Sequence, residues 1–490
     1  MRRHSGIHGC PRTARRRIVA LVATAGLAGL ASACATAAAP HAVHHSASAQ
    51  PVHVSAPRTP VRHIVLLYLE NHSFDDLLGY WCDQHRGRCP DGGMPASVRL
   101  SDGTVVTPGV SPDIVPPVSH SVASQRLAID GGKMDGWQKI KGCTASKKYA
   151  CISGYKPSHV PNLVSLANRF AISDRTFSMA DSPSWGGHLY AVMGSLDGFE
   201  GNNPVVTPGV KPGPGWGCDS RRITPWTSPG GTVRRVPSCV PDFSLGLRDG
   251  GAFRPTPAKY APTIMDRLHA AGLSWRIYGQ PTPPSSVKPA RQGYGWDICP
   301  SFAECLYTRQ KANNVPSASF VRDARSGHLP NFAVITPGGK DAVLSEHNGF
   351  SMTAGDDWVG QIASAVMHGP QWRSTTLFIT WDDCGCFYDQ VRPGVNPDGT
   401  AQGPRTPLVI VSPYVKRGFT DRTATTFAGI LAYTERTFGL APLGVNDAHA
   451  YPFSKSFDYE LPAFTPARTV DVPWPPGAYH VNLKEANQGT

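Results

Sequence analysis

The stretch HIVLLYLENHSFDDLLGY, residues 63–80, contains the pattern on which the fold prediction rests. Its first seven residues are almost all apolar, as expected of a strand buried on both faces of a parallel sheet. This run leads directly into Glu70 and Asn71, with more polar residues crowded behind them. In open α/β sheets, ligands bind beyond the carboxyl ends of the strands. The stretch therefore predicts a central strand that delivers a carboxylate and an amide to a binding site.

Alternating strands and helices are predicted along the rest of the chain. Strand-like apolar runs occur at 274–278, 332–336, 375–381 and 408–412. Helical periodicity occurs at 261–272, at 356–369 after an acidic first turn, and at 425–439. This order predicts an α/β fold with a mainly parallel central sheet flanked by helices on both faces.

The amino-terminal residues predict export. Residues 12–34 combine clustered arginines, an apolar run and small residues before Cys34, which is the form of an export signal. The run is too short and too rich in Gly and Ala to be a convincing membrane span. RRRIV also has the twin-arginine form. Cleavage near Ala39 is favoured over a lipid anchor at Cys34, and either outcome predicts a secreted or cell-surface protein.

The chain divides into four segments by composition. We expect an export signal at 1–39, a flexible linker at 40–60, one large catalytic domain at 61–465 and a polar tail at 466–490. Residues 1–34 hold six arginines and no acids, so the formal charge of +12 falls to +6 without them. This mild charge requires no nucleic-acid partner, and we expect at most peripheral membrane contact. The sequence does not decide the oligomeric state.

Ten cysteines follow the signal, and eight of them form close sequential pairs. In an oxidising compartment such pairs predict local disulfides that clip loop insertions. The predicted pairs are Cys82–Cys89, Cys143–Cys151, Cys218–Cys239 and Cys299–Cys305. Zinc ligation is the competing interpretation, but no CxxC pair supports it. Cys384 and Cys386 are too close for an easy disulfide with each other, so a bridge elsewhere or burial is favoured over metal ligation.

A second strand also ends in oxygen donors. Run 375–381 leads into Asp382 and Asp383, as run 63–69 leads into Glu70 and Asn71. Hard oxygen ligands that converge at one sheet edge predict a divalent cation, whose identity the sequence leaves open. The alternative is that both stretches are ordinary polar loop starts. Each stretch alone fits that alternative, but the two together fit it less well.

A candidate nucleophile and two candidate histidines accompany these ligands. Ser184 lies in a Pro/Gly-rich segment before an apolar run that can begin a helix. Next to a metal at a helix N-terminus, its hydroxyl would be activated and backbone N–H groups would cradle the phosphorus. His120 and His347 lie in polar, glycine-flanked loops, where they can bind a phosphoryl oxygen or protonate a leaving alkoxide. A simple turn at Ser184 is the alternative interpretation.

These motifs resemble a bacterial phosphoesterase family that contains phosphatidylcholine-type phospholipases C and acid phosphatases, related in fold to alkaline phosphatase. The likeness begins at 63–80 and continues, in order, through 120–137, 173–190, 346–391 and 403–420. It covers nearly all of the chain from 62 to 445. Five motifs in the same order are far more specific than any one of them.

The resemblance implies roles for individual residues. Glu70 with Asn71, and Asp382 with Asp383, match two metal-binding pairs. Ser184 matches a residue that is both a metal ligand and the phosphorylated nucleophile, and His120 and His347 match histidines on the phosphate and leaving-group side. The implied protein is an exported, metal-dependent phosphoesterase that acts on phosphate esters or phospholipid head groups through a serine phosphoenzyme.

Two departures from the family pattern leave an alternative open. Gly186, Gly187 and His188 stand where Pro-Asn-Arg is common, and Gln390 stands where a histidine is common. A catalytically weak cell-surface binding protein of the same fold is therefore the rival hypothesis. A sulfatase is excluded because no Cys-x-Pro-x-Arg string occurs.

Overall fold

The computed structural model describes residues 59–145, 149–242, 261–282 and 294–460. The predicted export signal, the linker up to residue 58 and the polar tail lie outside the described residues. Within these described ranges, no helix combines the length and the apolar composition that crossing a membrane requires.

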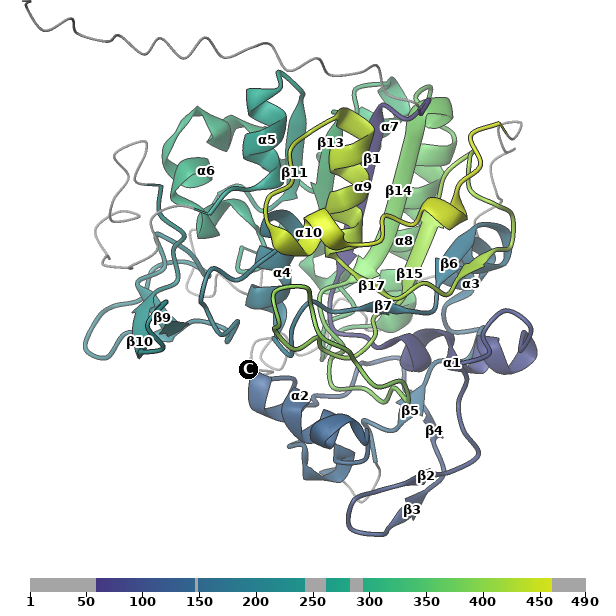
Figure 1. Ribbon diagram of the computed structural model, residues 1–490. Coiled ribbons are helices and arrows are strands. Elements are labelled where there is room, and N and C mark those ends of the chain that lie inside the picture. Colours follow the sequence, from purple (N-terminus) through teal and green to yellow (C-terminus); the bar gives the residue numbers. More distant parts are fainter. Residues whose placement is uncertain (1–58, 146–148, 243–260, 283–293, 461–490) are drawn as a thin grey trace, which may run out of the picture. The chain divides into compact units, whose positions relative to one another are not determined.

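An eight-stranded sheet forms the centre of the fold (Figure 1), in the order β12-β11-β13-β1-β14-β15-β6-β16. Its strands are β1 (His63–Leu69), β6 (Ala171–Ser173), β11 (Trp275–Gly279), β12 (Asn314–Pro316), β13 (Phe332–Ile335), β14 (Thr375–Trp381), β15 (Leu408–Val411) and β16 (Thr420–Asp421). The central strands β1 and β14 are buried along almost their whole length, which explains why their sequences are continuous apolar runs.

The register of the sheet brings the two polar strand ends together. β1 pairs in parallel with β13 on one side and with β14 on the other, and Leu69 lies opposite Trp381 at the carboxyl ends. β15 runs antiparallel to β14 and to β6. The prediction of a mainly parallel central sheet is therefore confirmed.

Ten helices are present in the described residues. They are α1 (Phe74–Gln84), α2 (Val122–Ile129), α3 (Pro161–Arg169), α4 (Ser184–Met193), α5 (Ile264–Ala270), α6 (Ala303–Tyr307), α7 (Ser319–Ser326), α8 (Met352–Met367), α9 (Ala428–Phe438) and α10 (Val445–His449). α3, α7 and α8 pack together as one group, and α4, α5 and α9 as another. In Figure 1, α9 lies in front of the sheet and α8 behind it, so both faces are covered as predicted.

The predicted acidic first turn at 356–369 is wrong. Helix α8 begins four residues earlier, at Met352, where the Ser351 side chain accepts a hydrogen bond from Ala354 N. Asp356 lies in the second turn and accepts hydrogen bonds from the backbone N–H groups of Asn162 and Leu163 at the start of α3. The carboxylate therefore caps a neighbouring helix rather than its own.

Short peripheral strands and four disulfide bonds complete the described structure. The strands are β2 (Val98–Arg99), β3 (Val105–Val106), β4 (Gly109–Val110), β5 (Ser153–Gly154), β7 (Thr176–Phe177), β8 (Val205–Val206), β9 (Arg222–Thr227), β10 (Val233–Pro237) and β17 (Thr425–Thr426). All four predicted disulfide pairs are confirmed. Cys384 and Cys386 are buried free thiols, one of the alternatives that the sequence left open.

A buried arginine ties together the two segments that follow β1 and β14. The Arg405 Nε donates to both carboxylate oxygens of Asp389, at 2.9 and 3.1 Å, and its Nη2 lies 3.1 Å from Asp75 Oδ1. The guanidinium also lies over the Phe74 ring, 4.6 Å from its centroid. Burial and the neighbouring Asp389 raise the pKa of Asp75 to about 7 despite this cation. Arg405 therefore offsets the cost of burying two adjacent carboxyl groups.

We expect the substitution Arg405→Met to destabilise the fold by about 3–5 kcal/mol, because it leaves Asp75 and Asp389 buried without their cation. Urea unfolding at neutral pH measures this change. Arg405→Lys keeps the charge but loses the planar fork of donors. Its free energy of unfolding should lie between those of Arg405→Met and the wild type. If Arg405→Met were as stable as the wild type, the ion pairs of Arg405 with Asp75 and Asp389 would not be what stabilises the segments after β1 and β14.

Candidate functional site

The four predicted oxygen ligands meet at the carboxyl ends of β1 and β14. Glu70 and Asn71 follow one strand, and Asp382 and Asp383 follow the other. The Asp382 Oδ1 accepts hydrogen bonds from the backbone N–H groups of Asn71 and Asp383, both at 2.8 Å. Asn71 has a φ of 68°, a left-handed conformation that Asn tolerates better than most residues. This sharp turn places the amide beside the carboxylates.

Helix α4 carries Ser184 to the same place. The helix begins at Ser184, and the Tyr68 hydroxyl of β1 donates to Gly187 O at 2.9 Å. The Ser184 hydroxyl lies near enough to the Glu70 and Asp382 carboxyls to lower their pKa by hydrogen bonding, although its Oγ has no well-aligned partner among the described residues. The structure thus brings the candidate nucleophile and the candidate ligands together.

The helix terminus itself offers fewer free donors than the sequence predicted. The N–H group of Trp185 donates to Asn203 Oδ1 at 2.8 Å, and that of Gly186 donates to Pro183 O at 3.0 Å. These two groups are therefore already engaged. The expected cradle of backbone donors is not formed by Trp185 and Gly186.

His188 belongs to this cluster, although it was not predicted from the sequence. Its Nε2 lies 2.8 Å from Glu70 Oε1, and one ligand atom each from Glu70, His188 and Asp382 all lie within 4.8 Å of one another. Ser184 and His188 are four residues apart on α4, so they share one face of the helix. This four-residue spacing is the feature of the sequence that could have identified His188.

The electrostatics of the cluster disfavour several negative charges in the absence of a cation. Burial raises the pKa of Glu70 to about 8, and side-chain hydrogen bonding with Asp382 and with Ser184 acts in the opposite direction. Burial, followed by the charge of Glu70, raises the pKa of Asp382 well above its usual range. Burial lowers the pKa of His188 to about 4, partly offset by Asp382. The histidine is therefore neutral near pH 7 and can act as a ligand.

The donor atoms fit a divalent cation. Five buried oxygens in this cluster have no well-aligned hydrogen-bond partner within the described part of the chain. They are Glu70 Oε2, Asn71 Oδ1, Ser184 Oγ, Asp382 Oδ2 and Asp383 Oδ2. Buried polar atoms are normally partnered, so several unpartnered oxygens in one place suit the binding of a charged group. Carboxylate and amide oxygens with one imidazole suit a hard or borderline divalent ion.

His120 and His347 form a pair. Their ring centroids lie 5.6 Å apart in an edge-to-face arrangement, and both side chains are buried. Burial lowers the pKa of His120 to about 4 and that of His347 to about 3. Nδ1 of each ring faces a backbone carbonyl, of Val118 at 3.2 Å and of Asn348 at 3.1 Å, so Nδ1 carries the hydrogen and Nε2 offers a lone pair. Rings of this form can accept hydrogen bonds at Nε2, and the predicted roles of both histidines toward the substrate stay predictions.

Two amides connect the histidine pair with the oxygen cluster. Asn348 Oδ1 accepts from Asn71 Nδ2 at 2.8 Å, and Asn348 Nδ2 donates to Pro116 O at 2.6 Å in the loop before His120. Gln125 Nε2 donates to His120 O at 3.1 Å and to Ser182 O at 2.9 Å. The loops that carry His120, His347 and Ser184 are thus joined by hydrogen bonds. Neither amide was predicted from the sequence.

The two departures at 186–188 and 390 have different consequences. Gly187 lies against β14, since a Cβ at this position would be 2.7 Å from Asp382 O. Gln390 contacts a different region, where its N–H donates to Asp75 Oδ2 at 3.1 Å and its Nε2 to Gly93 O at 3.0 Å. Residue 390 therefore supports a loop, while the glycine allows α4 to approach the ligands.

We expect Gly187→Ala to destabilise the fold by about 1–3 kcal/mol, because the added methyl group would overlap the backbone of Asp382. Hydrolysis should fall as well, since the helix that carries Ser184 must shift. Thermal unfolding and phosphate-ester hydrolysis measure the two effects. Gly87→Ala is the matched control, because no atom lies within 4 Å of a Cβ there. Wild-type behaviour of both variants would contradict the tight contact.

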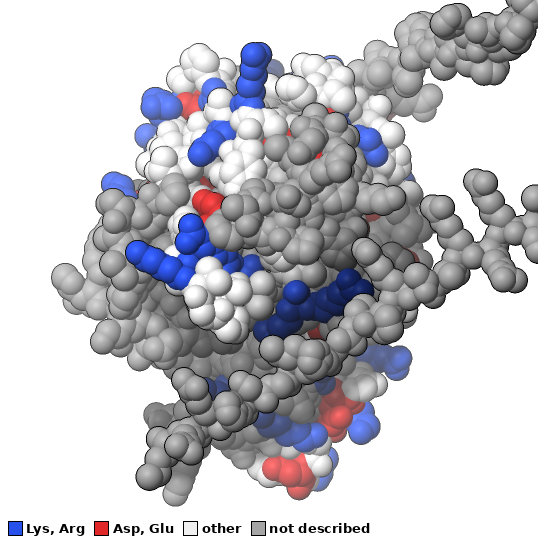
Figure 2. Space-filling model, turned by 90° about the vertical axis from the view of Figure 1, so that its left-hand side faces the viewer, with Lys and Arg blue, Asp and Glu red and all other residues white. Residues whose placement is uncertain are grey.

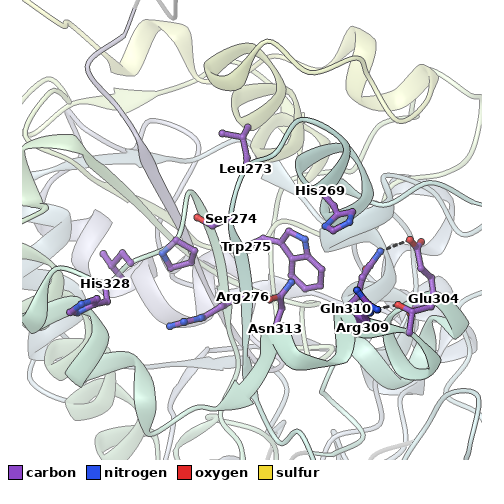
Figure 3. Close-up of a pocket in the computed structure, with 13 residues that line it drawn as sticks. His269, Leu273, Ser274, Trp275, Arg276, Glu304, Arg309, Gln310, Asn313 and His328 are labelled. Carbon is purple, nitrogen blue, oxygen red and sulfur yellow. Dashed lines mark hydrogen bonds between the residues drawn. The ribbon is translucent and has the colours of Figure 1, made fainter.

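A separate cavity of about 910 Å³ lies at the opposite end of the strands, away from the oxygen cluster (Figure 3). Its lining includes Ser274 and Trp275 at the start of β11, and Leu329 and Pro330 just before β13. These are the amino ends of parallel strands, whereas Glu70 follows a carboxyl end. None of the candidate catalytic or metal-binding residues lines this cavity.

Known proteins resemble most of this chain. A model of the Phosphoesterase family matches residues 61–441. Non-specific phospholipase C1 of Arabidopsis thaliana is 26% identical over 442 residues, which cover 81% of this chain and 71% of that protein. Non-hemolytic phospholipase C of Pseudomonas aeruginosa is 23% identical, over 78% of this chain and 54% of that protein. Phospholipase C A of Mycobacterium tuberculosis is 22% identical, over 73% and 68%.

Solved structures resemble the chain only distantly. A protein in the alkaline phosphatase superfamily from Vibrio parahaemolyticus matches with a TM-score of 0.33 and 12% identity, over 80% of this chain and 71% of that chain. The fold is therefore described from the sheet topology of this chain alone.

Proposed function

The chain belongs to the Phosphoesterase family and is a phosphoric ester hydrolase, and from this premise we propose that it is a metal-dependent phospholipase C with Ser184 as its nucleophile. The observation that supports this proposal most strongly is the set of five buried oxygens without aligned partners beside His188. A binding protein that had lost catalysis would have no need to keep such an arrangement, which is costly in the absence of a cation.

We propose that Glu70, His188 and Asp382 hold the cation, with Asn71, Asp383 and the Ser184 hydroxyl as further ligands. His188 is an addition to the set predicted from the sequence. When bound, the cation supplies positive charge that neutralises the ligands, lowers the pKa of the serine hydroxyl and stabilises negative charge on the phosphoryl oxygens.

The chain's own residues then divide the reaction into two displacements. Ser184 Oγ attacks phosphorus, and its proton passes through a neighbouring carboxylate oxygen to the leaving alkoxide, while the Oγ–P bond forms and the bond from phosphorus to that alkoxide breaks. In the second displacement water attacks the same phosphorus and the P–Oγ bond breaks. One proton of the water passes by the same carboxylate route to Ser184 Oγ, which regenerates the serine hydroxyl. His120 and His347, neutral with Nε2 lone pairs, fit the positioning of that water by accepting a hydrogen bond from it.

The relatives favour a phospholipid head group as substrate, because those reported above are phospholipases C by name. An acid phosphatase remains the rival activity on the same machinery. Export also remains part of the proposal, since four disulfide bonds fit an oxidising compartment.

Two soluble substrates separate these hypotheses. We expect hydrolysis of p-nitrophenyl phosphorylcholine, lost on treatment with a chelator and restored by a divalent metal. Hydrolysis of p-nitrophenyl phosphate alone would identify a phosphatase instead. Absence of activity on both substrates, with every divalent metal tried, would favour the binding-protein hypothesis and overturn the proposal.

A further inference from the structure

The small sheet β10-β9-β8 exposes an apolar face. In an antiparallel sheet, cross-strand partners point to the same side. Val205 lies opposite Ile223, and Val233 lies opposite Thr227, so these side chains share the outer face with Arg235. Val205 is 47% exposed and Val233 is 60% exposed. The solvent-exposed face of an antiparallel sheet is normally polar. Exposed aliphatic side chains on this face therefore indicate a surface that contacts a membrane or another molecule.

Cations flank the small sheet on both faces: Arg235 shares the outer face, and Arg234, opposite Trp226, follows the inner one on the exposed edge strand β10. Residues 200–237, which include all the chain paired in the small sheet, contain five cations and two acids. The cations are Lys211, Arg221, Arg222, Arg234 and Arg235. Of the acids, Asp219 accepts a hydrogen bond from the Tyr294 hydroxyl at 2.7 Å, and Glu200 lies beside β9, where its N–H group donates to Pro225 O at 3.2 Å. Figure 2 views the side of the molecule on which β9 and β10 lie, and shows Lys and Arg side chains beside uncharged surface there.

We propose that this surface, the outer face of β8–β10 with its rim of arginines, docks the enzyme on an anionic phospholipid bilayer. This inference rests on the proposed function, because it identifies the source of the substrate as a membrane. Aliphatic side chains enter the interfacial region of a bilayer, and guanidinium groups bind lipid phosphates in a bidentate manner. Exposed valines offer no flat ring on which a nucleic-acid base can stack, so the composition favours lipid over single-stranded nucleic acid.

The docking surface is connected directly to the helix of the nucleophile. Asn203 Oδ1 accepts the hydrogen bond from the N–H group of Trp185, the residue after Ser184, and β8 begins two residues later at Val205. The inner face of the sheet is anchored by Trp226, whose Nε1 donates to Asp197 O at 2.7 Å. The Cys218–Cys239 disulfide closes the loops on either side of β9 and β10. A bilayer held at β8–β10 is therefore presented to the same segment that positions Ser184.

The test compares vesicle binding with soluble catalysis in the full chain. Sedimentation with phosphatidylcholine vesicles, with and without phosphatidylglycerol, measures binding. We expect binding to increase with the anionic lipid and to weaken with salt. The double variant Arg234→Ser/Arg235→Ser should bind anionic vesicles about tenfold more weakly. Val205→Ser/Val233→Ser should also weaken binding, but with less dependence on salt.

The controls separate this inference from the proposed function. Arg325→Ser/Arg436→Ser removes two exposed cations outside the surface and should bind like the wild type. All variants should hydrolyse p-nitrophenyl phosphorylcholine at the wild-type rate, since none of these residues lies in the catalytic cluster. Equal vesicle binding by all three double variants would overturn the docking surface whatever the activity. Failure of the wild type to hydrolyse the soluble substrate would instead overturn the proposed function. The vesicle-binding measurement would still test the docking surface.

Discussion

Replacing Ser184 with alanine should reduce hydrolysis of p-nitrophenyl phosphorylcholine by at least about 10⁴-fold. The substitution removes the only atom that forms the covalent bond to phosphorus in the proposed mechanism. The buried carboxylates and His188 remain, so binding of the cation should weaken far less than catalysis. Steady-state kinetics at saturating metal concentration measures the loss.

Ser182→Ala is the matched control for this substitution. Both serines are buried and lie two residues apart in the same segment, but only Ser184 lies beside Glu70 and Asp382. The control should keep activity within about tenfold of the wild type, because it loses a hydroxyl that touches none of the candidate ligands. Rapid acid quenching followed by mass spectrometry should find phosphorylcholine on the wild-type chain and none on Ser184→Ala. An adduct that persists in the variant would assign the nucleophile to another residue.

The sequence predicted the central strands well because they are buried on both faces. The expected ranges 63–69 and 375–381 have the same bounds as β1 and β14. Strands of two or three residues, such as β6 and β16, are too short to show a periodicity. The start of α8 was misplaced because its cap, Ser351, lies outside the apolar pattern.

Some residues of the site could also be predicted from local sequence patterns, and others could not. Glu70 and Asp382 were predictable because parallel strands deliver their carboxyl ends to one edge. His188 was not, because its contact with Glu70 depends on how closely α4 packs on β14, and Gly187 permits that approach. Asn348 acts across two loops that are far apart in sequence, and no local spacing marks such a contact.

Asp382→Asn should have opposite effects on activity and on the stability of the metal-free protein. The asparagine keeps an oxygen that can accept the hydrogen bonds of Asn71 and Asp383, but it loses the charge and the second oxygen. We expect hydrolysis to fall by at least about 10³-fold, because the cation loses a ligand at the centre of the cluster. The metal-free variant should be at least as stable as the metal-free wild type, because one of the mutually repelling buried carboxyls has become neutral.

Thermal unfolding with a chelator, and then with each of several divalent metals, tests both halves of this prediction. A ligand that binds only the folded state at 100 times its Kd stabilises it by about 2.7 kcal/mol, so the wild-type Tm should rise clearly with the correct metal. That rise should be small or absent in Asp382→Asn. Asp83→Asn, which removes a carboxylate from a surface ion pair with Arg86, should keep the full rise and full activity. If Asp382→Asn retained the metal-dependent rise in Tm, the carboxylates of β1 and β14 would not be the cation site, and the buried oxygens would need another partner.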